Sequence, residues 1–290
     1  MKYDSLGTFL ETGTAALAKG PVGIILVEDA VEVDSTIRHH LDLGFRSLIV
    51  FAQDEIPIAA DLEPRIHRVN RTMHRRRAKV STINPLIAAA PPGTWMFYCY
   101  NAEYLFFPFS ETRSIGELLA FHTEERRAAM LTYVIDLYAA DLGQHPNGVD
   151  IGTALLDRSG YYALNRTDRA DPDRIMDRQL DFFGGLRWRY EEFVPPTHRK
   201  IDRIALFRSA PGLELRPDHT FSDEEYNTYS CPWHHNLTAA LMSFRVAKGL
   251  KYNPASTFDI HDFRWYHSVP FSWKSQQLMD LGLIEPGQWF

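Results

Sequence analysis

Acidic and amide side chains follow or interrupt three apolar runs of this sequence. Polar residues at the end of a buried strand commonly form a ligand site. Glu28 and Asp29 close the run "PVGIILVED", Asp54 closes "RSLIVFAQDE" one residue before its end, and Asn101 and Glu103 interrupt "YCYNAEYLFFP". Carboxylate and amide oxygens are the ligands that hard divalent cations prefer. Asn101 and Glu103 are the first candidates for a metal or phosphate site, and Glu28, Asp29 and Asp54 are candidates for contact with a ligand beside it.

The elements that would position these residues form a βαβ pattern. Residues 21–29 are a continuous apolar run typical of a strand buried on both faces, and residues 33–44 have helical spacing that Gly44 ends. A second apolar run follows, and a right-handed crossover makes the two strands parallel. Ligands bind beyond the carboxyl ends of such strands, so the acids are expected there. Residues 98–105 are predicted as a further strand of the same sheet.

The remaining chain is predicted from weaker patterns. We expect a helix over residues 114–142 that breaks near His122, and long loops from 143 to 181 with a short strand at "YYAL". A strand is expected at "KIDRIALFRS" and a helix over 236–250. The segment 65–79, "RIHRVNRTMHRRRAK", is strongly basic. It is either a solvated helix face or a patch that faces phosphates or an anionic membrane surface.

Composition excludes several classes of protein. The 290 residues carry a net charge of -6, which argues against bulk nucleic-acid binding, and two cysteines are too few for a disulfide scaffold. Neither a signal peptide nor a long apolar span is recognisable, so we expect a cytoplasmic protein with peripheral membrane contact left open. The Gly-rich dinucleotide fingerprint, the phosphate loop, the serine-hydrolase elbow and the zinc-protease motif are absent.

One piece of the sequence resembles a known family. The stretch "VEDAVEVDSTIRHHLDLGFRSLIVF" is similar to the opening of a branch of family 2-like glycosyltransferases, in which an acid-Ala pair is followed by a "HHLALGF"-like helix end and a strand. Here these features are Asp29-Ala30, the residues 39–45 and the step 52–54, without a gap. The resemblance covers about residues 23–120.

The resemblance implies a fold and an activity. It implies an α/β protein of GT-A-like (Rossmann-like) architecture, with a mostly parallel central sheet flanked by helices and an irregular C-terminal portion. The activity would be transfer of a sugar from a nucleotide-sugar donor to a glycan or surface-polymer acceptor, with Glu28, Asp29 and Asp54 at the nucleoside end. The corresponding division is an extension over residues 1–20, a donor half over 21–142, an acceptor half over 143–250 and a tail over 251–290.

The family's Asp-x-Asp-Glu-Phe-Leu motif is degenerate here. Glu103-Tyr104-Leu105 aligns with Glu-Phe-Leu, which places Tyr100 and Ala102 where two metal-binding aspartates belong. Three accounts are open. Asn101 and Glu103 could hold Mn²⁺ or Mg²⁺ as a shifted pair, positive side chains from the basic segment or from Arg187 and Arg189 could replace the cation, or catalysis could be lost.

Further candidates lie in the second half of the chain. "SCPWHHN" offers His234 or His235 as a metal ligand or acid-base group, against a reading in which both bond locally. "FFGGLRWRYEEF" could clamp a sugar and its phosphates through Arg187 and Arg189, or form a turn and an edge strand. Asp202 or Asp218 is expected to be the base that deprotonates the acceptor.

Two rival hypotheses remain beside the transferase. One is a catalytically silent binding or assembly module that reuses the fold. The other is a metal-dependent hydrolase centred on Cys231, His234 and His235.

Overall fold

The computed structural model describes residues 1–229 and 236–289, and the chain forms two compact units. Unit 1 contains residues 1–104, 112–130 and 204–227, and unit 2 contains residues 105–111, 131–203 and 228–290. Each unit is therefore assembled from separate stretches of the chain. The predicted boundary at residue 142 does not coincide with a boundary of either unit, and the predicted N-terminal extension belongs to unit 1.

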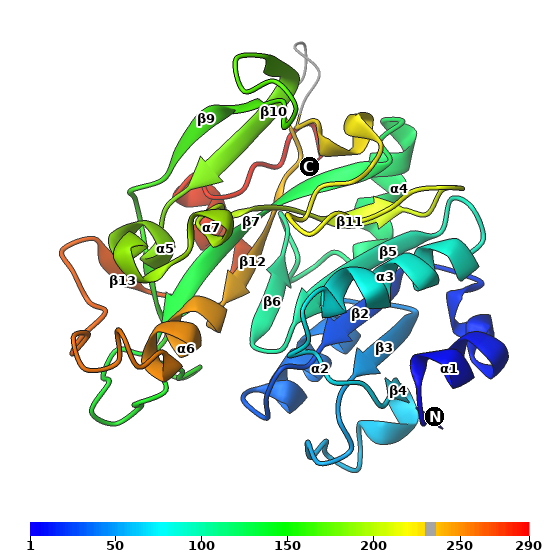
Figure 1. The fold of residues 1–290 in the computed structure, drawn as a ribbon, viewed down its shortest axis with the longest axis horizontal. Coiled ribbons are helices and arrows are strands. Elements are labelled where there is room, and N and C mark those ends of the chain that lie inside the picture. Colours follow the sequence, from blue (N-terminus) through cyan, green and yellow to red (C-terminus); the bar gives the residue numbers. More distant parts are fainter. Residues whose placement is uncertain (230–235, 290) are drawn as a thin grey trace. The chain divides into compact units, whose positions relative to one another are not determined.

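Unit 1 is built around a mixed sheet whose central strands are parallel (Figure 1). Its strands are β1 (Lys2–Tyr3), β2 (Val22–Leu26), β3 (Ser47–Phe51), β4 (His67–Val69), β5 (Trp95–Tyr100) and β11 (Asp202–Arg208), which enters from unit 2. They lie in the order β1-β4-β3-β2-β5-β11, and all are parallel except β11, which runs antiparallel to β5. This confirms the predicted α/β architecture and is compatible with a Rossmann-like fold.

The helices of unit 1 connect and cover these strands. They are α1 (Leu6–Thr12), α2 (Val33–Asp42), α3 (Ala78–Ala89) and α4 (Ile115–Glu124). The β2-α2-β3 connection moves outward across the sheet and the β4-α3-β5 connection moves back, so right-handed crossovers place α2 and α3 on opposite faces. Ser114 begins α4 with a capping box to Glu117.

Unit 2 contains shorter and less regular elements. Its strand β7 (Ala129–Tyr138) enters from unit 1 and pairs in parallel with β12 (Ala239–Ser243) and antiparallel with β8 (Leu155–Asp157), which pairs with β13 (Ser268–Pro270). A separate hairpin is formed by β9 (Tyr162–Thr167) and β10 (Ile175–Phe183). The helices are α5 (Leu186–Arg189), α6 (Arg245–Tyr252) and α7 (Ser275–Asp280), and β6 (Glu103–Phe106) enters this unit from unit 1.

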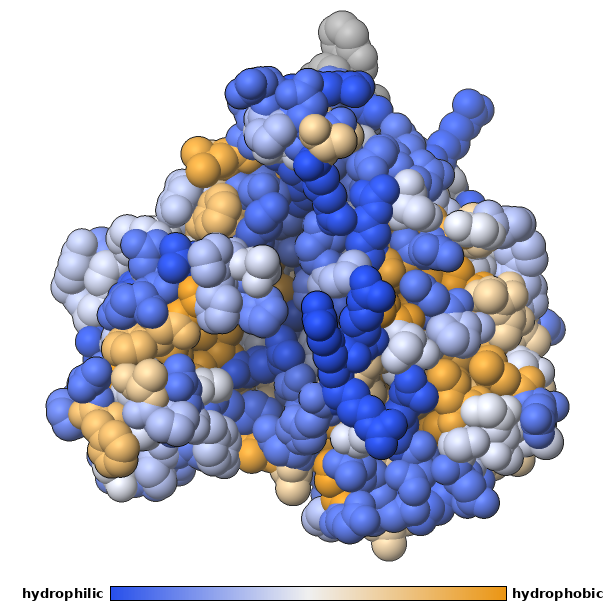
Figure 2. Space-filling model, in the orientation of Figure 1, coloured by the Kyte–Doolittle hydropathy of each residue, from blue (hydrophilic) through white to orange (hydrophobic). Residues whose placement is uncertain are grey.

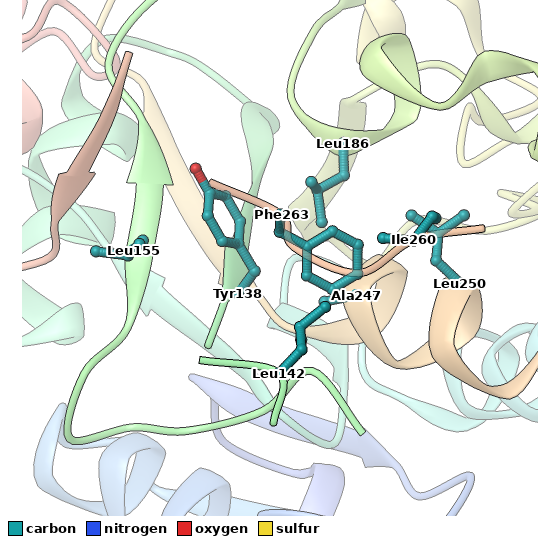
Figure 3. Close-up of a cluster of buried hydrophobic side chains, with 8 residues drawn as sticks. All are labelled: Tyr138, Leu142, Leu155, Leu186, Ala247, Leu250, Ile260 and Phe263. Atoms are coloured by element: carbon teal, nitrogen blue, oxygen red, sulfur yellow. The ribbon is translucent and has the colours of Figure 1, made fainter. Parts of the chain in front are cut away.

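A hydrophobic cluster holds the helices of unit 2 against its strands (Figure 3). Phe263 and Tyr138 lie at its centre, with ring centroids 5.8 Å apart, and Leu186 brings in α5. Leu250 and Ala247 bring in α6. The cluster therefore fixes α5, which carries two of the predicted site residues.

Several predicted elements differ from the structure. Residues 114–142 are not one broken helix, because the helix ends at Glu124 and β7 follows; its apolar residues are nearly continuous and gain backbone partners from β12. Residues 236–250 likewise divide into β12 and α6. The predicted strand over 98–105 is two strands, β5 and β6, separated by a turn at Asn101 and Ala102.

Candidate functional site

The carboxyl edge of the unit 1 sheet is where the strand order reverses. From β2 the chain moves to β3 and β4 on one side and then returns to β5 on the other. The order β4-β3-β2-β5 is the first half of the doubly wound pattern, in which ligands bind in the crevice outside the strand ends at the reversal. The segments that follow β2 and β5 meet at this point.

Asn101 ties these two segments together. Its Oδ1 accepts a hydrogen bond from the Glu28 N–H at 2.9 Å, and its Nδ2 donates to the Asp29 carboxylate at 2.8 Å and to the Val31 carbonyl at 2.8 Å. The side chain is fully buried. Asn101 therefore positions the loop after β2, and its only oxygen is already used by the backbone.

Glu103 serves the turn between β5 and β6. Its Oε2 accepts a hydrogen bond from the Tyr100 N–H at 2.8 Å, and its side chain is buried. The turn is completed by Ala102, which has a φ of 59° and donates its N–H to the Thr36 hydroxyl at 2.8 Å. The predicted pair of Asn101 and Glu103 thus lies at the expected edge, with both functional groups engaged inside the protein.

A divalent cation does not fit the donor set at this edge. The two positions of the family motif hold Tyr100 and Ala102, and the amide and carboxylate beside them are hydrogen bonded to the backbone. Among the residues that the structure describes, no group of three or more His, Cys, Asp or Glu side chains could hold a metal ion.

The predicted acids lie at the same edge. Glu28 and Asp29 are partly buried in the loop after β2, and the Asp29 carboxylate also accepts a hydrogen bond from the Val31 N–H at 2.9 Å. Asp54 lies in the loop after β3, where it forms an ion pair with Lys2 at 2.8 Å and accepts a hydrogen bond from Asn70 at 2.6 Å. The structure therefore brings three predicted carboxylates to one edge of the sheet.

The predicted basic segment is mostly not a helix. Its residues 70–77 form a loop between β4 and α3, here called the basic loop. His74, Arg75, Arg76 and Arg77 are exposed in it, and Arg77 precedes α3 with a φ of 63°. The prediction of a solvated helix face is wrong for these residues, because the helix begins only at Ala78.

The basic loop crosses the sheet edge from the β4 side toward the β5 side (Figure 1). Near the beginning of α3, Lys79 donates to the Pro217 carbonyl at 2.7 Å. His219, two residues later, accepts the N–H of Ile204 in β11 at 3.4 Å and contacts the Tyr98 hydroxyl of β5 at 2.8 Å. Because β4 and β5 are on either side of β3 and β2, the connection formed by the loop and α3 crosses those two strands, and the loop begins it at the carboxyl end of β4.

The two arginines of the predicted sugar-phosphate clamp, Arg187 and Arg189, form contacts inside unit 2. Arg189 forms an ion pair with the Asp157 carboxylate at 3.0 Å, and the same carboxylate accepts hydrogen bonds from Tyr138 at 2.5 Å and Trp265 at 2.7 Å. All four of these groups belong to unit 2, and Tyr138 is also a member of the hydrophobic cluster of Figure 3. We call this set the Asp157 cluster; it anchors α5 rather than offering a free cation.

Arg187 is likewise used inside unit 2. Its Nε lies 3.5 Å from Asp136, and its Nη1 donates to the Lys200 carbonyl at 2.7 Å. Burial raises the pKa of Asp136 to about 6, although the Arg187 guanidinium opposes this shift. The predicted edge strand at this position is the helix α5, and Gly185 before it has a φ of 66°.

The two predicted bases are also engaged. In unit 2, the buried Asp202 pairs with Arg166 at 2.5 Å and accepts the Phe182 N–H at 2.8 Å; burial raises its pKa. In unit 1, the Asp218 carboxylate accepts the Thr220 hydroxyl at 2.7 Å. His234 and His235, together with Cys231, lie outside the described residues.

Comparison with known proteins adds no assignment: neither a protein-family model nor a curated protein matches this chain. Within residues 1–229 and 236–289, no helix has the length and apolar character needed to cross a membrane.

Sequence reasoning missed two features of the site regions. No nearby residue of the sequence indicates that Asn101 holds the loop after β2, because its hydrogen-bond partners are 70 to 73 residues away. The Asp157 cluster joins residues from four separate segments, and only the composition of "RWRY" hinted at it.

Proposed function

We propose that this protein is a GT-A-type glycosyltransferase that moves a sugar from a nucleotide-sugar donor to a glycan or surface-polymer acceptor. The observation that carries the proposal is the strand reversal between β2 and β5, where carboxylates and a basic loop meet at one edge. The resemblance over residues 23–120 leads to the same edge independently, since its acid-Ala pair is Asp29-Ala30.

The residues at this edge have chemistry suited to a nucleotide sugar. Carboxylates such as Glu28 and Asp29 can accept hydrogen bonds from ribose or sugar hydroxyls. The hydrogen bonds of Asn101 hold the loop after β2 in place before a ligand binds, which lowers the entropic cost of binding. The basic loop provides positive charge for phosphates.

The transfer itself requires a defined exchange of bonds. The bond between the anomeric carbon and the diphosphate oxygen breaks, and its electron pair stays on the diphosphate. The acceptor hydroxyl oxygen forms the new bond to that carbon, and its proton passes to a carboxylate base. Asp202 and Asp218 are already hydrogen bonded in the structure, so the base is not assigned.

The proposal includes a cytoplasmic location. Cys99, which is buried and not in a disulfide, is compatible with a reducing compartment.

A thermal-shift experiment tests this proposal. UDP-, GDP- and CMP-sugars are added to the protein with and without Mn²⁺, and the melting temperature is compared with that of the free protein. A ligand at 100 times its Kd stabilises the folded state by about 2.7 kcal/mol. We expect one nucleotide class to produce such a shift, and Asp29→Asn to weaken it.

The matched control is Asp42→Asn. Asp42 is exposed at the end of α2, which is the opposite end from the loop that carries Asp29, so its replacement should leave the shift unchanged. If no nucleotide sugar shifts the melting temperature, the proposed function is wrong.

The engaged state of Asn101 and Glu103 also favours a second candidate, a silent module that keeps the fold. Such a module would show no nucleotide-dependent stabilisation under any of these conditions, so the same experiment separates the two.

A further inference from the structure

The basic loop concentrates positive charge in a protein whose net charge is -6. His74, Arg75, Arg76 and Arg77 are consecutive and exposed. In the described part of the chain, the three arginine side chains form neither an ion pair nor a hydrogen bond. By contrast, the exposed Arg38 of unit 1 forms an ion pair with Asp61 at 2.6 Å.

The charge of this loop also acts on its neighbour Arg71. Burial, and then the positive charge of Arg75, lower the pKa of the Arg71 guanidinium. Arg71 donates to the Ser81 hydroxyl at 2.9 Å, and its Nε is buried without a partner. A cluster of like charges that lacks a counter-charge is stabilised when an anion binds.

The loop leaves the carboxyl end of β4 and leads to the start of α3, so it carries this charge at the carboxyl edge of the sheet. The distance from β4 to β5 is three strand spacings, roughly 14 Å. The eight residues 70–77 can span up to about 26 Å when extended, so the loop has spare length to pass outside the strand ends. Figure 2 shows strongly hydrophilic residues on the surface over this part of unit 1, where Figure 1 places the loop.

The two motif positions at the same edge cannot hold a divalent cation that would neutralise a diphosphate. A cation would neutralise a diphosphate in a site with paired aspartates, but here those positions hold Tyr100 and Ala102. Guanidinium groups can do the same work, because each presents a planar fork of donors that matches two phosphate oxygens.

We propose that the basic loop binds the diphosphate of the donor through Arg75, Arg76 and Arg77 and replaces the divalent cation. This inference rests on the proposed function. When the bond to the sugar breaks, its electron pair adds one negative charge to the departing diphosphate, and the three arginines stabilise that charge. The donor therefore binds and reacts without a metal ion.

Binding of inorganic pyrophosphate and of UDP and GDP tests the inference. Isothermal titration calorimetry is performed on the full chain in EDTA, with the wild type and the triple variant Arg75→Gln, Arg76→Gln, Arg77→Gln. We expect pyrophosphate and one nucleoside diphosphate to bind the wild type in EDTA. The triple variant should bind pyrophosphate and that nucleoside diphosphate more weakly than the wild type. Each arginine that donates a pair of charged hydrogen bonds should contribute at least about a tenfold change in Kd.

Two further variants control for folding and for charge. The triple variant Lys19→Gln, Arg46→Gln, Arg126→Gln removes the same charge from exposed residues of unit 1 outside the loop, and it should bind as the wild type does. Replacement of the three loop arginines by lysine keeps the charge but loses the planar fork, so it should recover only part of the affinity.

The outcomes separate this inference from the proposed function. Absence of pyrophosphate and nucleotide binding in EDTA with binding restored by Mn²⁺ overturns the role of the loop and leaves the transferase standing. Equal affinity of the loop variant and the wild type also overturns it. Pyrophosphate binding that depends on the loop, with no additional affinity for UDP or GDP, supports the diphosphate site and refutes UDP- and GDP-sugars as donors.

Discussion

Replacement of Asn101 by aspartate gives the sharpest test of the site geometry. The change is isosteric and keeps an oxygen that can accept the Glu28 N–H, but it removes both donors of the amide. The new carboxylate would lie 2.8 Å from an oxygen of Asp29 and 2.8 Å from the Val31 carbonyl. A favourable contact between an amide and a carboxylate thus becomes a contact between two carboxylates.

The magnitude follows from the bonds that are lost. A neutral hydrogen bond contributes about 1 kcal/mol, and one to a charged group contributes about 1.5–3 kcal/mol. Loss of the bonds to Val31 and Asp29 therefore costs about 2.5–4 kcal/mol before any repulsion is counted. The neighbouring carboxylate also raises the pKa of the new group.

The pH dependence gives a signature with a defined sign. The pKa of the introduced aspartate is higher in the folded protein than in the unfolded chain. The protein is therefore more stable when this group is protonated at low pH, and it loses that stability as pH rises through the folded-state pKa. The deficit of Asn101→Asp relative to the wild type should thus be smaller at pH 5 than at pH 7.5.

Urea unfolding followed by tryptophan fluorescence at the two pH values measures this difference. Asn165→Asp, at an exposed position of β9, is the control and should change stability little at either pH. If Asn101→Asp is as stable as the wild type at pH 7.5, the role of Asn101 in holding the loop after β2 is refuted.

Three other predictions concern buried groups. Burial lowers the pKa of His40 from its ordinary 6.5 to about 3, so the folded protein loses stability as pH falls below 6.5. The variant His40→Gln lacks this titrating group. Urea unfolding should therefore show that its loss of stability between pH 7.5 and pH 5 is smaller than that of the wild type by about 2 kcal/mol. Asp157→Asn leaves the Arg189 guanidinium buried without its counter-charge and should cost about 3 kcal/mol; a loss below 1 kcal/mol would mean that the cluster does not anchor α5. Gly185→Ala would place a methyl group 2.8 Å from an Asp136 oxygen and should destabilise by about 1–3 kcal/mol in thermal unfolding, whereas Gly249→Ala, with open space around it, should not.

Much of unit 1 follows from local patterns. The apolar runs that became β2 and β3 and the helix α2 between them were all readable, because burial and helix ends leave signals within a few residues. The placement of Glu28, Asp29 and Asp54 at the carboxyl edge followed from the direction of a right-handed crossover.

Other elements could not be assigned because their signals are ambiguous without partners. The nearly continuous apolar run from residue 129 to 138 suits either a buried helix or a buried strand, and only its parallel pairing with β12 makes it β7. Similarly, the basic segment has the composition of an exposed helix, yet β4 takes His67–Val69 into the sheet and leaves the arginines in a loop.

The sequence by itself determined the parallel strands of unit 1 and the acids that lie at their carboxyl edge. Tertiary structure alone decided what the polar residues of "YCYNAEYLFFP" do: Asn101 holds a loop 73 residues away in sequence, and Glu103 caps the Tyr100 N–H. The physical reason is that residue type limits which hydrogen bonds a side chain can form, whereas strand order decides which partners come within reach. The same strand order carries the arginines of the basic loop to that edge.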